Sequence, residues 1–576
     1  MMSRKEITAT LKRYAFAAEV TGDDRVDGKA IAGALWGLRS IEEDLADLHA
    51  QGGIASHRQL PKAMKTALVA LLDGEPLPFA DELEAQVPDG VFDLQQVKGL
   101  GAKKIRQLWH DLDVTDLSSL AYACQENRLL TLKGFGEKTQ NKVLDQLATL
   151  QQNAKLRRLD HAMALSAEWC QVLGDVDGVV CVVEAGDVAR RQEVARSLHV
   201  VVAVDDDVEV MLPALADHLD QAGALDVDVV EELWLEARLE QFPLRIDVVF
   251  EEDLAPAVVW HTSDAEQQQA LSTRATAKGG RFQDGELLLQ GANVASEDDV
   301  YAALGLVPVP AERREGAVLV EQGTSQPRLL QRNDIQGALH NHTTASDGMN
   351  TLEQMHAAAS AMGLRYLGIS EHSESAVYAG GLTAAGLDKQ RSALDALNAK
   401  GEGAVLLASV ESDILPDGSL DYDAGVLDGL HHVIASVHAR GRLDRDGFTA
   451  RMVAAASSPH TDIIGHPTGR LILGRAPSDY DVEAFLDACA ASGTAVELNA
   501  NPARLDFNER HLAAAKERGI VVSVSADAHS VEALHHLDYG VAIARRAGLT
   551  PDDVLNCWDV ERLNAWLRSR RERASV

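Results

Sequence analysis

The sequence lacks paired cysteines, long apolar stretches and an excess of positive charge, and each absence excludes a class of protein. Its five cysteines lie far apart and form no C-x-x-C pair, which excludes a zinc ribbon and a disulfide framework. No apolar run reaches the roughly 18 residues that a membrane helix needs. The N-terminus predicts an amphipathic helix and not a signal peptide, so we expect a cytoplasmic protein with no membrane partner.

The scarcity of basic residues also limits how this chain can bind nucleic acid. It has 54 lysines and arginines against 88 aspartates and glutamates, which gives a net charge of −34. Neutralising DNA phosphates requires lysine and arginine, so broad nonspecific DNA binding is excluded, and any DNA contact should be local and geometric. The length of 576 residues predicts several domains instead of one core.

Residues 1–84 are predicted to form a helical domain with a supporting role. Apolar residues recur at helical spacing in two stretches of this segment. They are Ile7, Leu11, Tyr14 and Ala15 in the first stretch, and Ile31, Leu35, Leu38 and Ile41 in the second. A further short helix is expected to begin near Leu60 and to end at Gly74.

Two similar glycine turns occur within residues 85–152. Both have the form apolar-x-Gly-apolar-Gly-x-Lys and lie between helical patterns, where exposed backbone N–H groups can hold a phosphate. The predicted DNA-binding residues are Gly99, Gly101, Lys103 and Lys104 in the first turn, and Gly134, Gly136 and Lys138 in the second. The pair resembles the helix-hairpin-helix element, which holds the DNA backbone without reading its sequence. A plain packing unit of two helices is the alternative.

An α/β pattern begins at residue 153 and continues to residue 318. Apolar runs at 179–183, 200–204 and 244–250 predict buried strands. Acidic residues such as Asp205-Asp206-Asp207 surround them and would repel a nucleic-acid backbone, although most such runs are solvated faces. Residues 319–332 have the composition of a linker. Residues 333–576 alternate strands and helices, which predicts a parallel sheet or barrel.

Residues that bind metals recur at or just past the carboxyl ends of six candidate strands in this last segment. They are His340 and His342, Glu371 and His372, Glu411, His438, His466, and Asp527 with His529. In βα folds these strand ends meet at one mouth, and imidazole with carboxylate suits Zn²⁺, Mn²⁺ and Fe²⁺. The same placement after six strands favours a metal site over coincidence. Other histidines are expected to be ordinary, namely His431, His432, His460, His511, His535 and His536.

The motifs around these residues resemble those of the PHP (polymerase and histidinol phosphatase) family. They are His340-x-His342, Glu371-His372-Ser373, Ser436-Val437-His438, Gly465-His466-Pro467 and Asp527-Ala528-His529. The resemblance implies a distorted (β/α)7 barrel that holds three divalent metals, Mn²⁺ or Zn²⁺, with Fe²⁺ as a further candidate. The implied ligand sets are His340, His342, Glu411 and Asp527; then Glu411, His438 and His466; then Asp347, His372 and His529.

Clustered metals with a bridging carboxylate suit phosphoester hydrolysis, because they can activate water and neutralise the phosphate. The predicted catalytic residues are His340, His342, Glu411 and Asp527. Arg440 and Arg470 lie close in sequence to ligands and are candidate phosphate contacts, or else ordinary surface charges.

The order of hairpins, palm-like region and PHP-like region resembles the bacterial family X DNA polymerases over nearly the whole chain. In that family a Gly-Ser motif binds the triphosphate, and three aspartates hold two Mg²⁺ ions. Here Gly186 is followed by Asp187, Ser197 and His199 occupy the positions of the aspartate pair, and Asp247 alone matches. Asp187 would repel a triphosphate and Ser197 cannot bridge metals, so we predict a structural or DNA-positioning palm without polymerase activity.

The resemblance implies a metal-dependent DNA phosphoesterase, a 3′→5′ exonuclease of DNA repair that acts on gapped duplexes or 3′ ends. Activity at abasic sites or on 3′-phosphates is compatible with the same site. Two alternatives remain: a gap-filling polymerase that retains its exonuclease, and a small-molecule phosphatase similar to histidinol phosphatase. A DNA scaffold without activity is disfavoured, because scaffolding gives no reason to place ligands after six strands. No protein partner is evident from the sequence.

Overall fold

The computed structural model describes residues 4–35, 45–50, 52–57, 60–152, 155–230 and 234–574. The chain divides into two compact units, residues 1–148 and 149–576. Among the described residues, no helix is both long and apolar enough to cross a membrane. The five domain boundaries expected from the sequence stay predictions.

The first unit is helical. Its early helices are α1 (Arg4–Thr21), α2 (Gly28–Ala34), α3 (Leu45–Ala50), α4 (Gly53–Ser56) and α5 (Lys62–Leu72). The predicted apolar stripe of α1 is confirmed, because Ile7, Leu11, Tyr14 and Ala15 are all buried. Ile31 is also buried, whereas Leu38 and Ile41 lie outside the described residues.

The later helices of this unit frame the two glycine turns. They are α6 (Ala80–Gln86), α7 (Asp89–Asp93), α8 (Ala102–Leu112), α9 (Leu117–Gln125) and α10 (Glu137–Gln152). A capping box at Asp116 fixes the start of α9: its carboxylate accepts from the backbone N–H of Ser119, whose hydroxyl in turn receives the N–H of Asp116. Glycine turns therefore precede both α8 and α10, as the sequence pattern predicts.

A mixed five-stranded sheet forms the first part of the second unit. Its strands are β2 (Val179–Ala185), β4 (Leu198–Val204), β5 (Leu225–Val230), β6 (Trp234–Leu239) and β7 (Phe242–Phe250), in the order β2-β4-β7-β6-β5. The three predicted strands are confirmed. Strands β4 and β7 run parallel, with Val201 paired to Asp247 and His199 paired to Arg245.

Helices cover both faces of this sheet. They are α11 (Leu159–Gly174), α12 (Gly186–Ala189), α13 (Val208–Gln221), α14 (Leu254–Thr262), α15 (Ala265–Ala277) and α16 (Glu297–Ala303). Residues of α11 and α13 share a core with Val200, Val202 and Val204, while Val201 packs on the other face with Ala257 and Val258 of α14. This split follows from the alternation of side chains along β4. Two short ribbons complete the region: β1 (Arg157–Arg158) with β3 (Val194–Ala195), and β8 (Arg281–Gln283) with β9 (Glu286–Leu288).

Seven parallel strands form the second part of this unit, and each pairs with the next one in sequence. They are β10 (Gly337–Ala338), β11 (Tyr366–His372), β12 (Val405–Asp413), β13 (His432–Ser436), β14 (Ile463–Ile464), β15 (Ala495–Asn499) and β16 (Val522–Ser525). A parallel bridge between Asn341 and Ala528, just past β10 and β16, nearly closes the sheet into a barrel. The predicted barrel is thus observed in outline.

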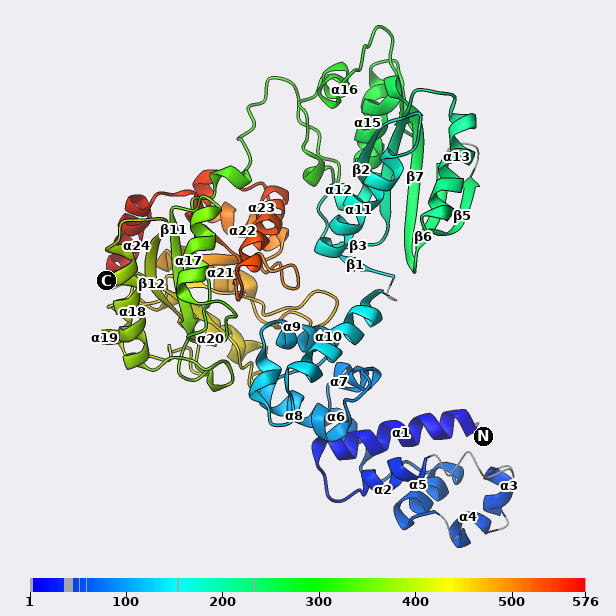
Figure 1. Cartoon of the computed structure of the whole chain (residues 1–576), viewed down its shortest axis with the longest axis vertical. Coiled ribbons are helices and arrows are strands. Elements are labelled where there is room, and N and C mark those ends of the chain that lie inside the picture. Colours follow the sequence, from blue (N-terminus) through cyan, green and yellow to red (C-terminus); the bar gives the residue numbers. More distant parts are fainter. Residues whose placement is uncertain are drawn as a thin grey trace. The chain divides into compact units, whose positions relative to one another are not determined.

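Helices are arranged around these strands (Figure 1). They are α17 (Leu352–Ala361), α18 (Ala384–Asn398), α19 (Ala424–Leu427), α20 (Arg445–Ser457), α21 (Val482–Ser492), α22 (Glu509–Glu517), α23 (Leu537–Arg546) and α24 (Val560–Ala574). The strands are buried on both faces, as parallel strands in α/β folds are. One strand, β15, was not singled out from the sequence.

Candidate metal centre

The nine predicted metal-binding residues all lie at one end of the barrel. His372 ends β11 and Glu411 lies near the end of β12, whereas His438 and His466 follow β13 and β14 by two residues. His340, His342, Asp527 and His529 follow β10 and β16, and Asp347 lies in the loop after β10. Parallel strands bring their carboxyl ends to the same edge, which is why residues nearly 200 positions apart meet.

Glu411 lies at the centre of this group and is 1% exposed. Its carboxylate faces five imidazole rings. Oε1 lies 3.0 Å from His466 Nε2, 3.2 Å from His438 Nε2 and 3.5 Å from His340 Nε2, and Oε2 lies 2.9 Å from His372 Nδ1 and 3.7 Å from His342 Nε2. A carboxylate in this position has the geometry of a bridging ligand, which is the role that the sequence predicts for it.

Two further carboxylates flank Glu411. Asp527 Oδ1 lies 3.5 Å from His340 Nε2 and 3.3 Å from His342 Nε2. Asp347 lies 3.4 Å from His372 Nε2 through Oδ2 and 3.3 Å from His529 Nε2 through Oδ1. The three carboxylates thus lie within the three ligand sets implied by the sequence.

His342 joins two of these sets, which the sequence did not predict. Its ring stacks between His372 and His529, with centroid distances of 4.4 and 4.2 Å. Its ligand atoms lie within 4.8 Å of those of Asp347, His372 and His529, and also of those of His340 and Asp527. The segment that follows β10 therefore places the imidazole of His342 between two candidate metal positions.

Several buried polar atoms of this group suit metal coordination. His340 Nε2, both ring nitrogens of His342, and Glu411 Oε2 make no hydrogen bond within the described chain, although oppositely charged atoms lie 2.9 to 3.7 Å away. Leaving buried polar atoms unsatisfied costs about 1–3 kcal/mol each, unless a ligand compensates. Neutral imidazole with carboxylate is the donor set of borderline divalent metals. The buried clusters therefore indicate divalent metal binding.

Burial and the nearby carboxylates shift the pKa values of the histidines in this centre in different directions. Burial, with the neighbouring rings of His529 and His372, lowers the pKa of His342 to about 3. Burial also opposes the charge on His372, but the carboxylates of Asp347 and Glu411 outweigh it and raise the pKa to about 10. The same balance raises the pKa of His340 well above its usual value. Without metal, protons on these rings compensate the buried carboxylates.

Two of the nine residues have unusual backbone conformations. His466 and Asp527 have φ values of 25° and 48°, in the left-handed region that non-glycine residues rarely adopt. Such conformations cost about 1–3 kcal/mol each and persist where surrounding structure enforces them. Their occurrence at two candidate ligands indicates a site held in place by its surroundings.

Two carboxylates that the sequence reasoning missed orient the histidines. Glu497 Oε1 accepts a hydrogen bond of 2.6 Å from His340 Nδ1, and Asp413 Oδ1 accepts one of 2.6 Å from His438 Nδ1. Each bond leaves Nε2 facing Glu411, as in carboxylate–histidine–metal arrangements. Glu497 lies on β15, the strand that was not recognised. Acidic residues in an otherwise apolar strand were the available signal.

A third buried acid organises the loop that carries Asp347. Glu371 is fully buried and accepts hydrogen bonds from the backbone N–H and hydroxyl of Thr343 and from the hydroxyl of Ser346. Burial raises the pKa of Glu371 despite these donors. Its position directly before His372 suggested a ligand from sequence, but the structure gives it a loop-holding role.

Arg440 and Arg470, the two candidate phosphate contacts, interact with other residues of the chain. Arg440 donates to the backbone carbonyls of Thr468, Gly469 and Ala476. Arg470 donates to the carbonyls of Arg504 and Leu505 and pairs with Glu193. Both arginines therefore support the loops around the mouth in this structure.

The remaining histidines mostly have structural contacts. His432 is buried in β13, and its Nε2 lies 2.8 Å from the carbonyl oxygen of Leu339. His431 Nδ1 accepts from the backbone N–H of Ala408 at 3.0 Å. Both fit the expectation that they are ordinary residues.

The two glycine turns of the first unit have matching geometry. Gly99 and Gly134 have φ values of 96° and 93°, which glycine adopts without strain. In each turn the apolar residue that follows is buried and donates its N–H to the carbonyl three residues back, Leu100 to Val97 and Phe135 to Leu132. Gly101 and Gly136 then accept from the first turns of α8 and α10.

The lysines of these turns differ in their surroundings. Lys103 and Lys138 are exposed. Lys104 is half-buried and donates from Nζ to the carbonyl oxygen of Gly99 at 3.2 Å, so it stabilises its own turn. Two glycine turns with exposed lysines are compatible with the predicted backbone contacts to DNA.

In the palm-like sheet, the matching aspartate is fully engaged by neighbouring side chains. Arg245 donates to both carboxylate oxygens of Asp247 at 3.0 and 2.8 Å, and His199 Nε2 lies 2.5 Å from Oδ2. Burial opposes the charge on Asp247, but these contacts outweigh it and lower the pKa below the usual range. His261 Nδ1 lies 3.7 Å away, and burial lowers the pKa of its ring to about 4.

The other four positions of the palm motif are Gly186, Asp187, Ser197 and His199. A Cβ added to Gly186 would lie 3.0 Å from that of His199, so the glycine and histidine are neighbours. Asp187 accepts from Arg190 at 2.7 Å and from the backbone N–H of Arg196 at 3.1 Å. Ser197 directly precedes β4. Among these four positions, Asp187 alone carries a carboxylate, and that carboxylate pairs with Arg190. The four positions therefore supply no second carboxylate beside Asp247.

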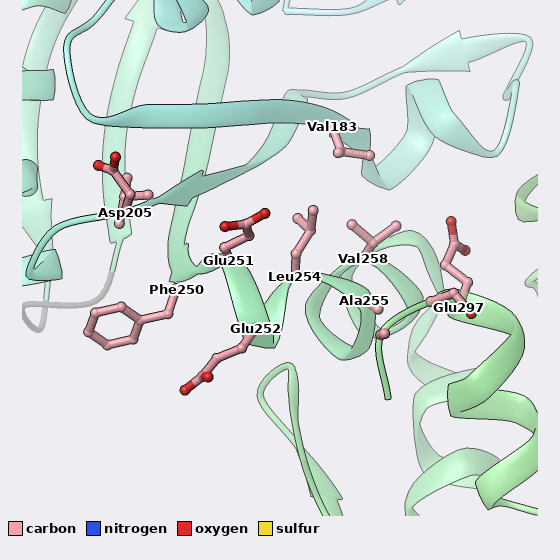
Figure 2. A pocket seen from close by; sticks show the side chains of 12 residues that line it. Val183, Asp205, Phe250, Glu251, Glu252, Leu254, Ala255, Val258 and Glu297 are labelled. Atoms are coloured by element: carbon pink, nitrogen blue, oxygen red, sulfur yellow. The ribbon is translucent and has the colours of Figure 1, made fainter. Parts of the chain in front are cut away.

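A cavity of about 840 Å³ lies at the other end of strands β4 and β7. Figure 2 shows apolar side chains of Val183, Leu254 and Val258 with acidic side chains of Asp205, Glu251, Glu252 and Glu297 around them. The acidic residues would repel a phosphate-bearing ligand. This cavity is therefore a poor candidate for nucleotide binding.

The chain is similar to a known protein over nearly its whole length. It is 31% identical to the DNA polymerase/3′-5′ exonuclease PolX of Bacillus subtilis, over 98% of this chain and the full length of the relative. A probable phosphatase of Thermoanaerobacter sp. is 30% identical over 190 residues, 31% of this chain and 75% of the phosphatase. A polymerase β of Leishmania infantum in a ternary complex has a TM-score of 0.25 at 12% identity, over 39% of this chain and 97% of the other, which supports no conclusion.

No family model matches the chain. The relationship instead rests on the full-length match. The chain belongs to the family of the bacterial PolX proteins, the family X DNA polymerases with a C-terminal phosphoesterase-like barrel.

Proposed function

We propose that this protein is a metal-dependent DNA phosphoesterase, a 3′→5′ exonuclease that acts in DNA repair. The observation that carries the proposal is the convergence of nine buried or half-buried ligand-type side chains, with Glu411 at their centre, at the barrel mouth. The name of the full-length relative includes this activity. DNA with gaps or free 3′ ends is the proposed substrate.

The ligand sets we propose are those that the family resemblance implies, and the short distances between their side chains support them. His340, His342, Glu411 and Asp527 would hold one metal, Glu411, His438 and His466 a second, and Asp347, His372 and His529 a third. Bound metals would lower the pKa of water and neutralise the phosphate and the leaving oxygen. The chain itself orients the rings of His340 and His438 through Glu497 and Asp413, and buries Glu411 away from bulk water.

We propose that residues 85–152 hold DNA through the backbone N–H groups of the turns at Gly99 and Gly134. The exposed lysines Lys103 and Lys138 would add charge next to the phosphates. The preceding residues 1–84 would support this domain, and the palm-like residues 153–318 would connect it through the linker 319–332 to the barrel 333–576.

We also propose that the palm-like sheet has no polymerase activity. Two-metal nucleotidyl transfer needs carboxylates that face the metals, but both oxygens of Asp247 accept hydrogen bonds from Arg245 and His199. Asp187, beside Gly186, would repel an incoming triphosphate.

The test is one gapped DNA substrate labelled at the 3′ end and incubated with purified full-length protein and Mn²⁺. Shortening from the labelled end is expected, and it should be abolished in His340→Ala/His342→Ala. His431→Ala is a matched control, because that residue accepts from a backbone N–H and not from the centre. If the labelled end stays intact with Mn²⁺, Zn²⁺ and Fe²⁺, the exonuclease proposal is wrong.

Two other functions are each favoured by one finding. The name of the full-length relative also includes polymerase activity, so primer extension on the same gapped substrate is measured in parallel. Extension that is lost in Asp247→Asn would show that the palm is active. The relationship of the barrel to probable phosphatases favours a small-molecule phosphatase, which release of phosphate from a sugar phosphate without DNA cleavage would support.

A further inference from the structure

The loops at the barrel mouth carry most of the large apolar side chains that the described barrel residues expose. Met349, Val377, Leu443 and Leu473 are 58%, 81%, 40% and 48% exposed, and they lie in the loops after β10, β11, β13 and β14. The backbone N–H of Met349 donates to the carbonyl of the candidate ligand His529 at 2.7 Å. Exposed apolar side chains on the loops around a site are available for contact with a ligand.

These loops form the rim of the barrel mouth, and Tyr378 is an aromatic residue in the one that follows β11. It lies on the short 3₁₀ helix η7 (Val377–Ala379), directly after the highly exposed Val377. Its ring centroid is 6.3 Å from that of His372 and 6.2 Å from that of His438, and those two rings are 5.0 Å apart. A half-buried phenol ring thus lies beside two candidate ligands of Glu411.

The loop that carries Tyr378 is fixed to the metal centre. Ser375 donates from its hydroxyl to Asp413 Oδ2 at 2.5 Å, while Asp413 Oδ1 accepts from His438. The N–H of Leu382 donates to the carbonyl of His372 at 2.8 Å. A Cβ at Gly381 would lie 1.8 Å from a carbonyl oxygen of Ser373, so this approach requires glycine. The ring position is therefore set in advance of ligand binding.

We propose that Tyr378 stacks on the base of a nucleotide whose phosphate lies at the metal centre, and that it determines specificity for an unpaired terminal nucleotide. This inference rests on the proposed phosphoesterase function and names the part of the substrate that the rim recognises. An aromatic ring about 6 Å from two ligand imidazoles is within the span of one nucleotide. Stacking accepts any base, and a base inside a duplex is not available to it.

Direct binding tests the inference on the full-length protein loaded with Mn²⁺. Thymidine 5′-monophosphate is compared with 2-deoxyribose 5-phosphate, which lacks the base, by calorimetry. Wild type is expected to prefer the nucleotide by about tenfold or more, the scale of one base–aromatic stack. Tyr378→Ala should lose this preference and keep its affinity for the sugar phosphate, whereas Tyr378→Phe should retain both.

Metal content, measured by mass spectrometry, should be equal in all three proteins. The inference is overturned if wild type shows no preference, or if Tyr378→Ala keeps it, or if that variant binds both ligands and the metals less well. That last outcome would mean that Tyr378 only supports His372 and His438. Cleavage is measured separately on 3′ ends with a normal or an abasic last residue. Absence of any cleavage, with the binding preference intact, would contradict the exonuclease proposal and leave the stacking inference standing.

Discussion

At the scale of single residues, hydrogen bonds to two carboxylates orient two histidines of the candidate metal centre. Glu497 and Asp413 bond to Nδ1 of His340 and His438 and thereby leave Nε2 for the cluster around Glu411. An imidazole without such a partner can rotate or present the other nitrogen. These two acids are therefore as important for the centre as several of the ligands themselves.

Replacing Glu497 by glutamine should weaken metal binding without removing any ligand. The amide cannot hold His340 Nδ1–H as strongly as the carboxylate does, so we expect a loss of about 10- to 100-fold in metal affinity. Calorimetric titration with Mn²⁺ and metal content after dialysis measure it. Glu402→Gln, at an exposed position, is the matched control and should behave as wild type. Unchanged affinity in Glu497→Gln would show that His340 is oriented by other contacts.

Metal binding should release protons and strengthen as the pH rises. Burial disfavours charge on the ring of His372, but Asp347 and Glu411 raise its pKa to about 10, so the ring is protonated at neutral pH in the metal-free protein. Coordination needs the neutral ring, so each metal that binds there displaces a proton. Affinity should therefore rise from about pH 6 to about pH 9. Titrations in buffers of different ionisation enthalpy count the protons. Binding that is independent of pH would contradict the proton assignment.

At the scale of elements, the ends of strands and the glycine turns determine where the candidate functional groups lie. The ligands after β13 and β14 follow strands of five and two residues, so register and not strand length places them. In the first unit, glycine in the left-handed region lets the chain turn tightly into α8 and α10. In both cases the backbone sets the positions: strand register places the candidate ligands, and glycine with positive φ places the N–H groups of the turns.

Gly99→Ala and Gly134→Ala should weaken DNA binding through the backbone. No atom among the described residues lies within 4 Å of the added Cβ, so the cost comes from the positive φ, roughly 1–2 kcal/mol per site. We expect the turns to relax and the affinity for gapped DNA to fall, measured by fluorescence anisotropy. Gly33→Ala is the matched control, because that glycine lies within α2 with open space and no positive φ. Equal affinities in all variants would exclude the turns from the DNA contact.

At the scale of the whole molecule, charge sets the way in which DNA can be bound. The net charge of −34 disfavours broad attraction of a polyanion, so the proposed DNA contacts would be restricted to places such as the glycine turns and the metal centre. Binding should then be limited to a few phosphates near a recognised structure.

The salt dependence of DNA affinity should accordingly be shallow. If about four phosphates are neutralised, the slope of log K against log salt is about −3.6. Anisotropy titrations of full-length protein between low and moderate salt measure this slope. Lys103→Gln/Lys138→Gln should reduce its magnitude by about 2, because two phosphate contacts are removed. A slope near −10 would indicate an extended basic surface, contrary to the composition.

Arginines also join the two parts of the second unit. Arg546 of α23 is 8% exposed, and it donates to the backbone carbonyl of Arg190 and, at 2.9 Å, to Glu315. Arg545 donates to Glu312 at 2.7 Å. These partly buried pairs connect the palm-like region to the barrel.

The sequence by itself determined the kinds of residue and their places in the chain. Ligand-type side chains after successive apolar strands predicted the barrel and its mouth, because parallel strands bring their carboxyl ends to one edge. The glycine turns depend on local residue types and were readable from the sequence, whereas the assignment of Ser197 and His199 to the carboxylate positions rests on the family resemblance and stays a prediction. The family resemblance supplied the grouping of ligands, which spacing alone does not give.

Tertiary structure decided which groups meet. That Glu497 on β15 orients His340, that His342 lies between two candidate metal positions, and that Asp413 joins Tyr378's loop to His438 all depend on residues far apart in sequence. The packing of neighbouring strands and loops sets such distances, and no local pattern encodes them. The contact between Asp247 and His199 also depends on tertiary structure, because the register of β4 against β7 brings the two side chains together.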